Sequence, residues 1–145
     1  MVKVLIKKLN PEAKLPNYKT KGSSGMDLMA CIEKSIKILP GKSALVPTGL
    51  SIAIPDDTEV QIRPRSGLAA KSSISVLNTP GTIDSDYRGE IKVIIYNHSN
   101  KEFFVNNGDR IAQMILMPVF KFKFEEVDIL STTVRGSGGF GSTGK

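Results

Sequence analysis

Short segments rich in β-branched and other apolar residues recur along the whole chain, separated by turn-forming stretches such as PG, IPDD and NNGD. The segments that read as strands are VKVLI, ALVPTGLSIAI, TEVQIRP, EIKVIIYN, RIAQMILM and VFKFKFEEV. Only SGLAAKSS has helical character, and it is too short for more than about two turns. The sequence therefore predicts an all-β fold, a jelly-roll-like barrel or sandwich with one short helix.

Two of these segments differ in how their apolar residues are arranged. In residues 119–127, VFKFKFEEV, phenylalanines alternate with lysines, which predicts a strand with one buried face and one face in solvent. Residues 110–118, RIAQMILMP, are almost continuously apolar, which predicts a strand covered on both faces. Gln113 lies inside this run, so its amide must find hydrogen bonds in the core, at a subunit contact or from a ligand.

The length and charge of the chain limit its organisation and its partners. With 145 residues it can form one domain with a core, and it leaves surface that further copies could cover. Twenty Lys and Arg against 14 Asp and Glu favour anionic partners such as phosphates, nucleic acid or an acidic membrane surface. The basic residues are spread along the chain, which weakens the nucleic-acid interpretation.

Cys31 is the only cysteine and His98 the only histidine of the chain. A single thiol excludes an intrachain disulfide and a multi-cysteine zinc site, which suits a reducing cytoplasm. Ser–His or Cys–His catalysis would depend on one histidine, which the turn-like NHSN places in an exposed loop. No signal peptide or membrane span is visible, so we expect a soluble cytoplasmic protein.

The last eleven residues, RGSGGFGSTGK, contain five glycines, two serines and a threonine. This composition predicts a flexible tail over residues 135–145 that follows a β domain over residues 1–134. A solvated tail or a cloning remnant is the plain alternative. Arg135 and Phe140 are the only bulky side chains of the tail before the terminal lysine, and an aromatic ring could stack on a nucleobase.

The tail has the G-x-x-x-x-G spacing of a P-loop at Gly136 and Gly141, but Ser142 and Thr143 follow where a P-loop has Lys and Ser/Thr. What remains is the general property of glycine-rich backbone. Its N–H groups can surround phosphate oxygens, with hydroxyls and an arginine as further donors. The tail therefore indicates a polyphosphate ligand.

A second anion site is indicated where the short helix begins, in RPRSGLAAK. Arg65, Ser66 and the N–H of Gly67 could hold a phosphate there, and an N-cap role for Ser66 is the structural alternative. Ser66 does not fit a nucleophile, because Lys71 does not complete an S-x-x-K motif and no histidine is near it in the sequence.

Carboxylates occur in two further stretches. Asp27 lies in the small and apolar SSGMDLMA, and Asp84 and Asp86 lie with Tyr87 in the hairpin-like GTIDSDYRGEIKV. Ordinary turn residues are the plain interpretation of both stretches. With a triphosphate ligand, Asp27 could instead contact Mg²⁺ through water, because Mg²⁺ keeps several waters and needs only one or two carboxylates.

Taken together and in order, SSGMDLMA, RPRSGLA, GTIDSDYRGE, GDRIAQMIL and RGSGGFGSTG resemble the five motifs of the homotrimeric dUTPase family. The resemblance covers residues 23–144, and the departure we note is Ser24, where alanine is common. It implies hydrolysis of dUTP to dUMP and pyrophosphate, with Mg²⁺ as cofactor and active sites shared between three chains. That activity limits uracil in DNA and supplies dUMP for dTMP synthesis.

The resemblance also implies roles for the hairpin residues. Asp84 would be the general base that activates the water attacking the α-phosphorus, and Asp86 would hold the hairpin together. Tyr87 would lie against the deoxyribose, where a 2′-hydroxyl would need space.

By the same resemblance, Asn78 would read the uracil edge, because an amide presents both a donor and an acceptor. Backbone groups around Thr82 and Ile83 and the return strand near Lys92 would assist it. This arrangement would exclude cytosine by its hydrogen bonds and thymine by its shape.

The phosphates would be bound from two parts of the chain. In the β domain the resemblance assigns them to Arg65, Ser66, Gly67 and Gln113. The tail would close over the nucleotide with Phe140 near the uracil, and with Arg135, Gly141, Ser142 and Thr143 beside the phosphates. Asp27 would contact Mg²⁺ through water, with the metal held mainly by the substrate phosphates, and the strand around Gln113 would line the trimer axis.

Two other functions fit parts of this pattern. A dCTP deaminase or a bifunctional deaminase–dUTPase would share the β fold and the triphosphate site, but the glycine tail with Phe140 favours a dUTPase. A non-enzymatic jelly-roll protein that binds nucleic acid through its positive charge would leave Asp84 and Tyr87 without a role. We therefore expect dUTP as the ligand, further copies of the chain as partners, and neither nucleic acid nor membrane.

Overall fold

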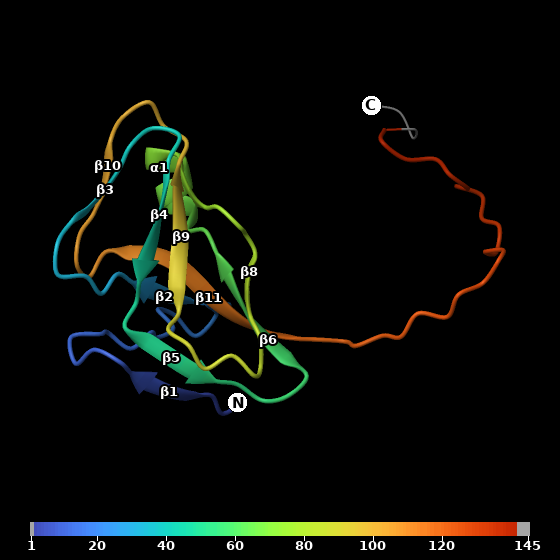
Figure 1. Cartoon of the computed structure of the whole chain (residues 1–145), viewed down its shortest axis with the longest axis horizontal. Helices are drawn as coiled ribbons and strands as arrows, with labels where there is room; N and C mark the ends of the chain where they lie inside the picture. The colour runs from blue at the N-terminus through green and yellow to red at the C-terminus, as the bar shows by residue number, and fades with distance from the viewer. Residues whose placement is uncertain (1, 142–145) are drawn as a thin grey trace.

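The computed structural model describes residues 2–141 of the chain, which form many short strands and one short helix (Figure 1). The elements are β1 (Leu5–Lys8), β2 (Met26–Met29), β3 (Ile36–Ile38), β4 (Ser43–Pro47), β5 (Leu50–Ala53), β6 (Thr58–Arg63), α1 (Ser66–Ser72), β7 (Ile74–Val76), β8 (Gly81–Ile83), β9 (Lys92–Asn97), β10 (Phe103–Val105) and β11 (Arg110–Pro118). The prediction of an all-β fold with one short helix is confirmed.

The strands form four separate antiparallel sheets, in the orders β1-β5, β10-β3, β2-β11-β6-β8 and β4-β9-β7. The β1–β5 pair lies at one end of the domain and α1 at the other (Figure 1). Within the described residues the sheets do not join into a closed barrel, so the closed form of the predicted architecture is not observed. A sequence pattern marks which segments are strands, but not whether the outermost strands of two sheets meet.

Alternating burial along the strands builds the core between these sheets. In β9, Val93 and Ile95 are buried while Lys92 is exposed, as the period of two requires. Asn97, at the end of the same strand, is fully buried, and its Nδ2 donates to the backbone oxygens of Ile38 at 3.0 Å and Lys101 at 2.7 Å. A buried amide with its hydrogen bonds made is stable in a core, and here it fixes the turn that follows β9.

β11 is the central strand of the largest sheet, between β2 and β6. Ile111 and Ala112 are both buried, as are Met114 and Ile115, so consecutive side chains on opposite faces are covered. The prediction of a strand covered on both faces is therefore confirmed. Gln113 is half-buried, and its Nε2 donates to the backbone oxygen of Pro64 at 2.9 Å.

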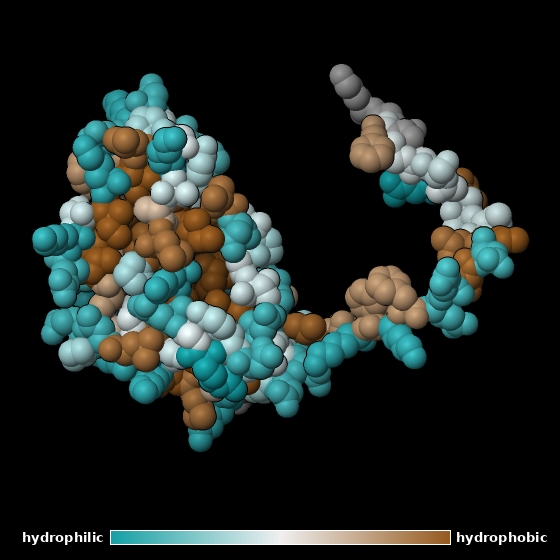
Figure 2. Space-filling model, viewed as in Figure 1, coloured by the Kyte–Doolittle hydropathy of each residue, from teal (hydrophilic) through white to brown (hydrophobic). Residues whose placement is uncertain are grey.

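After β11 the chain leaves the domain as an extended arm that forms no strand up to residue 141 (Figure 1). The strand predicted over residues 119–127 is therefore wrong for this single chain. Phe120, Phe122 and Phe124 are 90%, 79% and 85% exposed, and apolar side chains stand out along the arm (Figure 2). A strand needs a partner for its backbone hydrogen bonds. Within the described residues the domain offers the arm only one, where the N–H of Val119 donates to the backbone oxygen of Asp57 at 2.9 Å. The predicted division at residue 134 stays a prediction.

No helix in the described residues is long and apolar enough to cross a membrane. His98 is exposed, as its place in NHSN predicts.

Candidate active site

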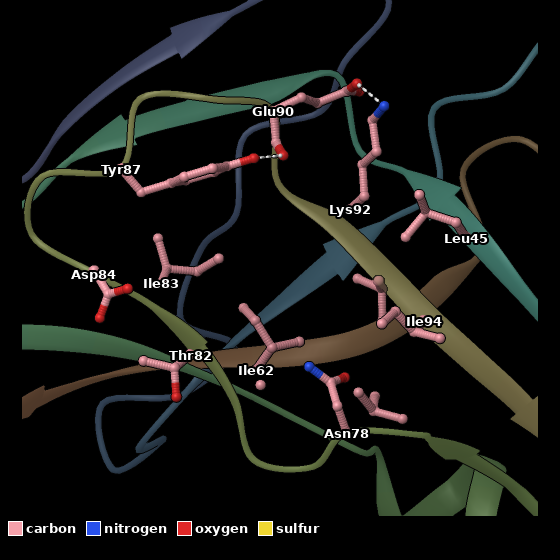
Figure 3. A pocket seen from close by; sticks show the side chains of 13 residues that line it. Leu45, Ile62, Asn78, Thr82, Ile83, Asp84, Tyr87, Glu90, Lys92 and Ile94 are labelled. Carbon is pink, nitrogen blue, oxygen red and sulfur yellow. Dashed lines mark hydrogen bonds and ion pairs between the residues drawn. The ribbon is translucent and has the colours of Figure 1, made fainter.

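A pocket of about 300 Å³ opens between β8 and β9 (Figure 3). This volume is at the lower end of the range of small-molecule sites. Six predicted site residues line it: Asp84, expected to be the general base, and the five assigned to the nucleoside, Asn78, Thr82, Ile83, Tyr87 and Lys92. The structure thus brings together side chains that lie up to fourteen positions apart in the sequence.

Asp84 lies where β8 ends and the chain turns. β8 is held in register by β6, with Thr82 opposite Gln61 and Ile83 opposite Val60. The turn that follows is closed by the N–H of Tyr87, which donates to the backbone oxygen of Asp84 at 3.1 Å. The carboxylate of Asp84 is exposed at the rim of the pocket, where it can accept a proton from water.

Arg88, which belongs to the motif GTIDSDYRGE but was not predicted as a site residue, stabilises the same turn. Its Nη1 donates to the backbone oxygens of Ser85 at 2.6 Å and Tyr87 at 2.9 Å. Within residues 2–141 the side chain of Asp86 makes no such link. The structural role expected of Asp86 is thus filled by Arg88 in this structure.

Asn78 lies at the opposite edge of the pocket from Tyr87, with its amide directed inwards near Ile62 (Figure 3). Gly81 allows this approach, because a Cβ at that position would lie 3.3 Å from Asn78 Nδ2 and 3.3 Å from Ile62 Cβ. Asn78 is exposed in the single chain, and its amide presents both a donor and an acceptor, so it can discriminate between ring edges by hydrogen bonding.

Several lining residues were not predicted as site residues: Leu45, Ile62, Val76, Gly81, Glu90, Val93 and Ile94. Most of them are apolar strand residues, and their pattern is the same whether they face the core or a pocket. Glu90 is different, because it is a charged residue of the motif GTIDSDYRGE. Its carboxylate pairs with Lys92, with Oε2 and Nζ 3.6 Å apart.

A second group of predicted residues lies around the start of α1 and beside β11. Asp27 Oδ1 accepts a hydrogen bond from Arg65 Nε at 2.8 Å, and Oδ2 accepts one from Arg110 Nη1 at 3.2 Å. The side chain of Asp27 is 15% exposed. The carboxylate of Asp27 thus holds two guanidinium groups in place. Arg110 was not predicted as a site residue, although it belongs to the motif GDRIAQMIL.

Ser66 and Gly67 are the first residues of α1, and both are exposed. The N-cap residue is Arg65, whose side chain makes no capping bond, so the alternative role of Ser66 as N-cap is wrong. The first amides of a helix have no acceptor within the helix, and this leaves them available to an anion. A Cβ at Gly67 would meet nothing within 4 Å, so the approach to these amides is open.

The tail forms a third group, away from the pocket of its own chain (Figure 1). Arg135 Nε donates to the backbone oxygen of Gly138 at 2.8 Å, and Phe140 is fully exposed. Gly141 has a φ of +90°, a conformation that favours glycine. The positions expected to bind phosphate at Ser142 and Thr143 lie outside the described residues.

A β fold that directs an amide, a phenol and a carboxylate around one pocket, with an arginine cluster elsewhere on its surface, is suited to an enzyme that acts on a nucleotide. The chain belongs to the dUTPase family, whose model matches residues 11–144. Deoxyuridine 5′-triphosphate nucleotidohydrolases are among its relatives. That of Clostridium tetani is 56% identical over 140 residues, covering 97% of this chain and 95% of the relative. That of Hydrogenobaculum sp. is 54% identical over 143 residues, covering 99% of both chains.

Solved structures have the same fold. The dUTPase of Staphylococcus bacteriophage 80alpha, solved with dUpNHpp, matches with a TM-score of 0.89 at 22% identity, covering 99% of both chains. A dUTPase variant from phage phi11 of S. aureus, described with a structural Mg(II) ion, matches with a TM-score of 0.81 at 18% identity, covering 90% of this chain and 99% of that one. The expected family is thus confirmed.

Proposed function

We propose that this enzyme hydrolyses dUTP to dUMP and pyrophosphate. The observation that carries the proposal is the pocket in which Asn78, Tyr87 and Asp84 meet, since these groups suit a base edge, a sugar and an attacking water. Membership of the dUTPase family supports it. In this role the enzyme limits uracil in DNA and supplies dUMP for dTMP synthesis, and its free, buried Cys31 suits the reducing cytoplasm where we place it.

Asn78 provides the base recognition. Its amide can donate to a uracil carbonyl and accept from the neighbouring N–H, while the backbone of Thr82 and Ile83 and the strand near Lys92 close the edge. Cytosine would reverse one of these partners, and a site built on buried hydrogen bonds rejects such a mismatch by about 10⁴-fold. The methyl group of thymine would meet the hairpin.

Asp84 provides the general base. A water held by its carboxylate attacks the α-phosphorus while its proton moves to Asp84, and the bond from that phosphorus to the bridging oxygen of pyrophosphate breaks. The position of Asp84 at the end of β8 suits this step, because the paired strand fixes its backbone while its side chain remains in solvent.

The phosphates are bound by groups outside the pocket. Arg65, Ser66, Gly67 and Gln113 supply donors, and the ion pair with Asp27 keeps Arg65 in place. None of these residues lines the pocket of its own chain. This separation supports a homotrimer in which one chain supplies Asp84 and others supply the phosphate-binding residues and the tail.

Mg²⁺ fits this site as a metal carried by the triphosphate. Both oxygens of Asp27 already accept hydrogen bonds from arginines, so Asp27 would contact the metal only through water. Residues 2–141 contain no group of three or more His, Cys, Asp or Glu that could hold a metal by themselves. When bound, Mg²⁺ would neutralise charge on the phosphates.

The test is to incubate the purified protein with Mg²⁺ and each deoxynucleoside triphosphate, and to measure released pyrophosphate. We expect pyrophosphate from dUTP alone. Equal release from dCTP or dTTP would contradict the assignment of the base pocket.

Replacing Phe140 with alanine should lower kcat/KM for dUTP, because the exposed ring is free to stack on the uracil of a neighbouring site. A stacked aromatic contributes about 1–3 kcal/mol. Ser137→Ala in the same tail is the matched control and should behave as wild type. If Phe140→Ala also leaves kcat/KM unchanged, the tail does not stack on the nucleotide.

A further inference from the structure

Tyr87 lies so close to Gly89 that no other residue fits there without moving the ring. A Cβ at Gly89 would lie 2.5 Å from Tyr87 Cζ and 2.9 Å from Cε2. The φ of Gly89 is not among the positive values of this chain, so the position demands space and not a special backbone conformation. The lack of a side chain at Gly89 thus leaves the space that the Tyr87 ring occupies.

Glu90 fixes the far end of the same ring. The hydroxyl of Tyr87 donates to the backbone oxygen of Glu90 at 2.9 Å, as Figure 3 shows. The carboxylate of Glu90 in turn accepts a hydrogen bond from the N–H of Gly49 at 2.9 Å and pairs with Lys92. Glu90, whose backbone oxygen binds the Tyr87 hydroxyl, is therefore itself bonded to the turn at Gly49.

The turn that anchors Glu90 is tightly packed. Gly49 has a φ of +67°, and a Cβ there would lie 2.9 Å from Ala13 Cβ and 3.0 Å from Cys31 Sγ. Next to it, Thr48 Oγ1 donates to the backbone oxygen of Ile91 at 2.7 Å in the buried core. The anchor thus connects the Tyr87 loop to the tightly packed junction between β4 and β5.

We infer that Gly89 and Glu90 are positioning residues that set the selectivity of the pocket for a 2′-deoxyribose. The inference rests on the proposed function, in which Tyr87 faces the sugar. Tyr87 is 43% exposed, so surrounding side chains do not immobilise its ring. A ring excludes a hydroxyl group by its bulk only while it stays in place, and Gly89 and Glu90 are what keep it there.

Gly89→Ala is the direct test. The clashing atoms belong to the end of one side chain, so the variant should fold while the ring is displaced. We expect the ratio of kcat/KM for dUTP to kcat/KM for UTP to fall by about tenfold. Gly22→Ala is the matched control, because a Cβ there meets nothing within 4 Å, and its ratio should equal that of the wild type. An unchanged ratio in Gly89→Ala would overturn the inference.

Two further comparisons separate positioning from a general loss of structure. In a Tyr87→Ala background, Gly89→Ala should cause no further loss of selectivity, because the ring it displaces is absent. Glu90→Gln keeps an oxygen for the N–H of Gly49 and should retain most of the selectivity, whereas Glu90→Ala should lose it. An added loss in the double variant, or equal ratios for the two Glu90 variants, would contradict the inference.

The position of the ring can also be followed without activity. The aromatic NMR signals of Tyr87, assigned through Tyr87→Phe, should shift in Gly89→Ala and Glu90→Ala but not in Gly22→Ala. A wild-type protein that does not cleave dUTP would overturn the proposed function. Unshifted Tyr87 signals in both variants would overturn the positioning roles whatever the activity.

Discussion

Asp84→Asn is expected to lower kcat by about 10²–10⁴-fold, the usual contribution of a positioned general base. The asparagine has the same shape but cannot take the proton of the attacking water. The exposed side chain of Asp84 makes no contact that holds the fold within the described residues, so unfolding temperature and dUMP affinity should match wild type. Kinetics with dUTP would measure the loss of turnover, thermal unfolding would measure the stability, and calorimetric titration would measure the affinity for dUMP.

The matched control is Asp86→Asn, which removes a neighbouring carboxylate from the same exposed turn. Its kcat should stay near the wild-type value, because Arg88 holds the turn without it. Wild-type turnover in Asp84→Asn would remove Asp84 from the mechanism. An equal loss in both variants would indicate that the carboxylates act only through their combined charge.

Removing the tail should have an effect of similar size, and it allows the shared active site to be tested. One chain carries Asp84→Asn with its tail intact, and the other keeps Asp84 but lacks all residues after Val134. Each variant alone should form a nearly inactive homotrimer, because every site then lacks either its base or its cover.

Unfolding the two variants, mixing them in equal amounts and refolding them should restore activity. About three quarters of randomly assembled closed trimers contain both chains. In each mixed trimer, one of the three sites combines an intact Asp84 from one chain with an intact tail from its neighbour. Since about three quarters of the trimers are mixed, about one quarter of all sites should be active. Steady-state dUTP hydrolysis, with mixed trimers confirmed by native mass spectrometry, measures the recovery.

The refolded wild type, taken through the same steps, is the reference for full recovery. If mixed trimers form and remain inactive, Asp84 and the tail of one chain serve the same site. The extended arm of Figure 1 would then have to fold back onto its own domain.

The sequence predicted the longer strands, such as β9 with its alternation and β11 with its continuous apolar run. It did not identify β2, β3, β7 and β10, which have only three or four residues each and are too short to show a clear period. It failed for residues 119–127, whose alternation is just as regular. Periodicity reports which face of a segment is apolar, and it cannot report whether the partner strand belongs to the same chain. The open sheets have the same explanation, since closure depends on which strand edges meet.

For the candidate site, too, some residues were predicted from the sequence and others were missed. Asn78, Asp84 and Tyr87 were predicted, because polar groups in specific motifs indicate chemistry, and the structure brings them to one pocket. Arg88 and Arg110 were missed, because their roles consist of contacts with backbone and with a distant carboxylate. Such contacts depend on the folded geometry, and neither spacing nor residue type reveals them.

Cys31, the only thiol of the chain, is 8% exposed and lies beneath the Gly49 turn that anchors Glu90. Its N–H donates to the backbone oxygen of Pro47 at 2.9 Å, so the cysteine and the turn are fastened together. A buried thiol reacts with a labelling reagent only when the segment over it opens. The rate of Cys31 modification in the native protein therefore reports how often this junction comes apart, a local stability that unfolding of the whole domain would conceal.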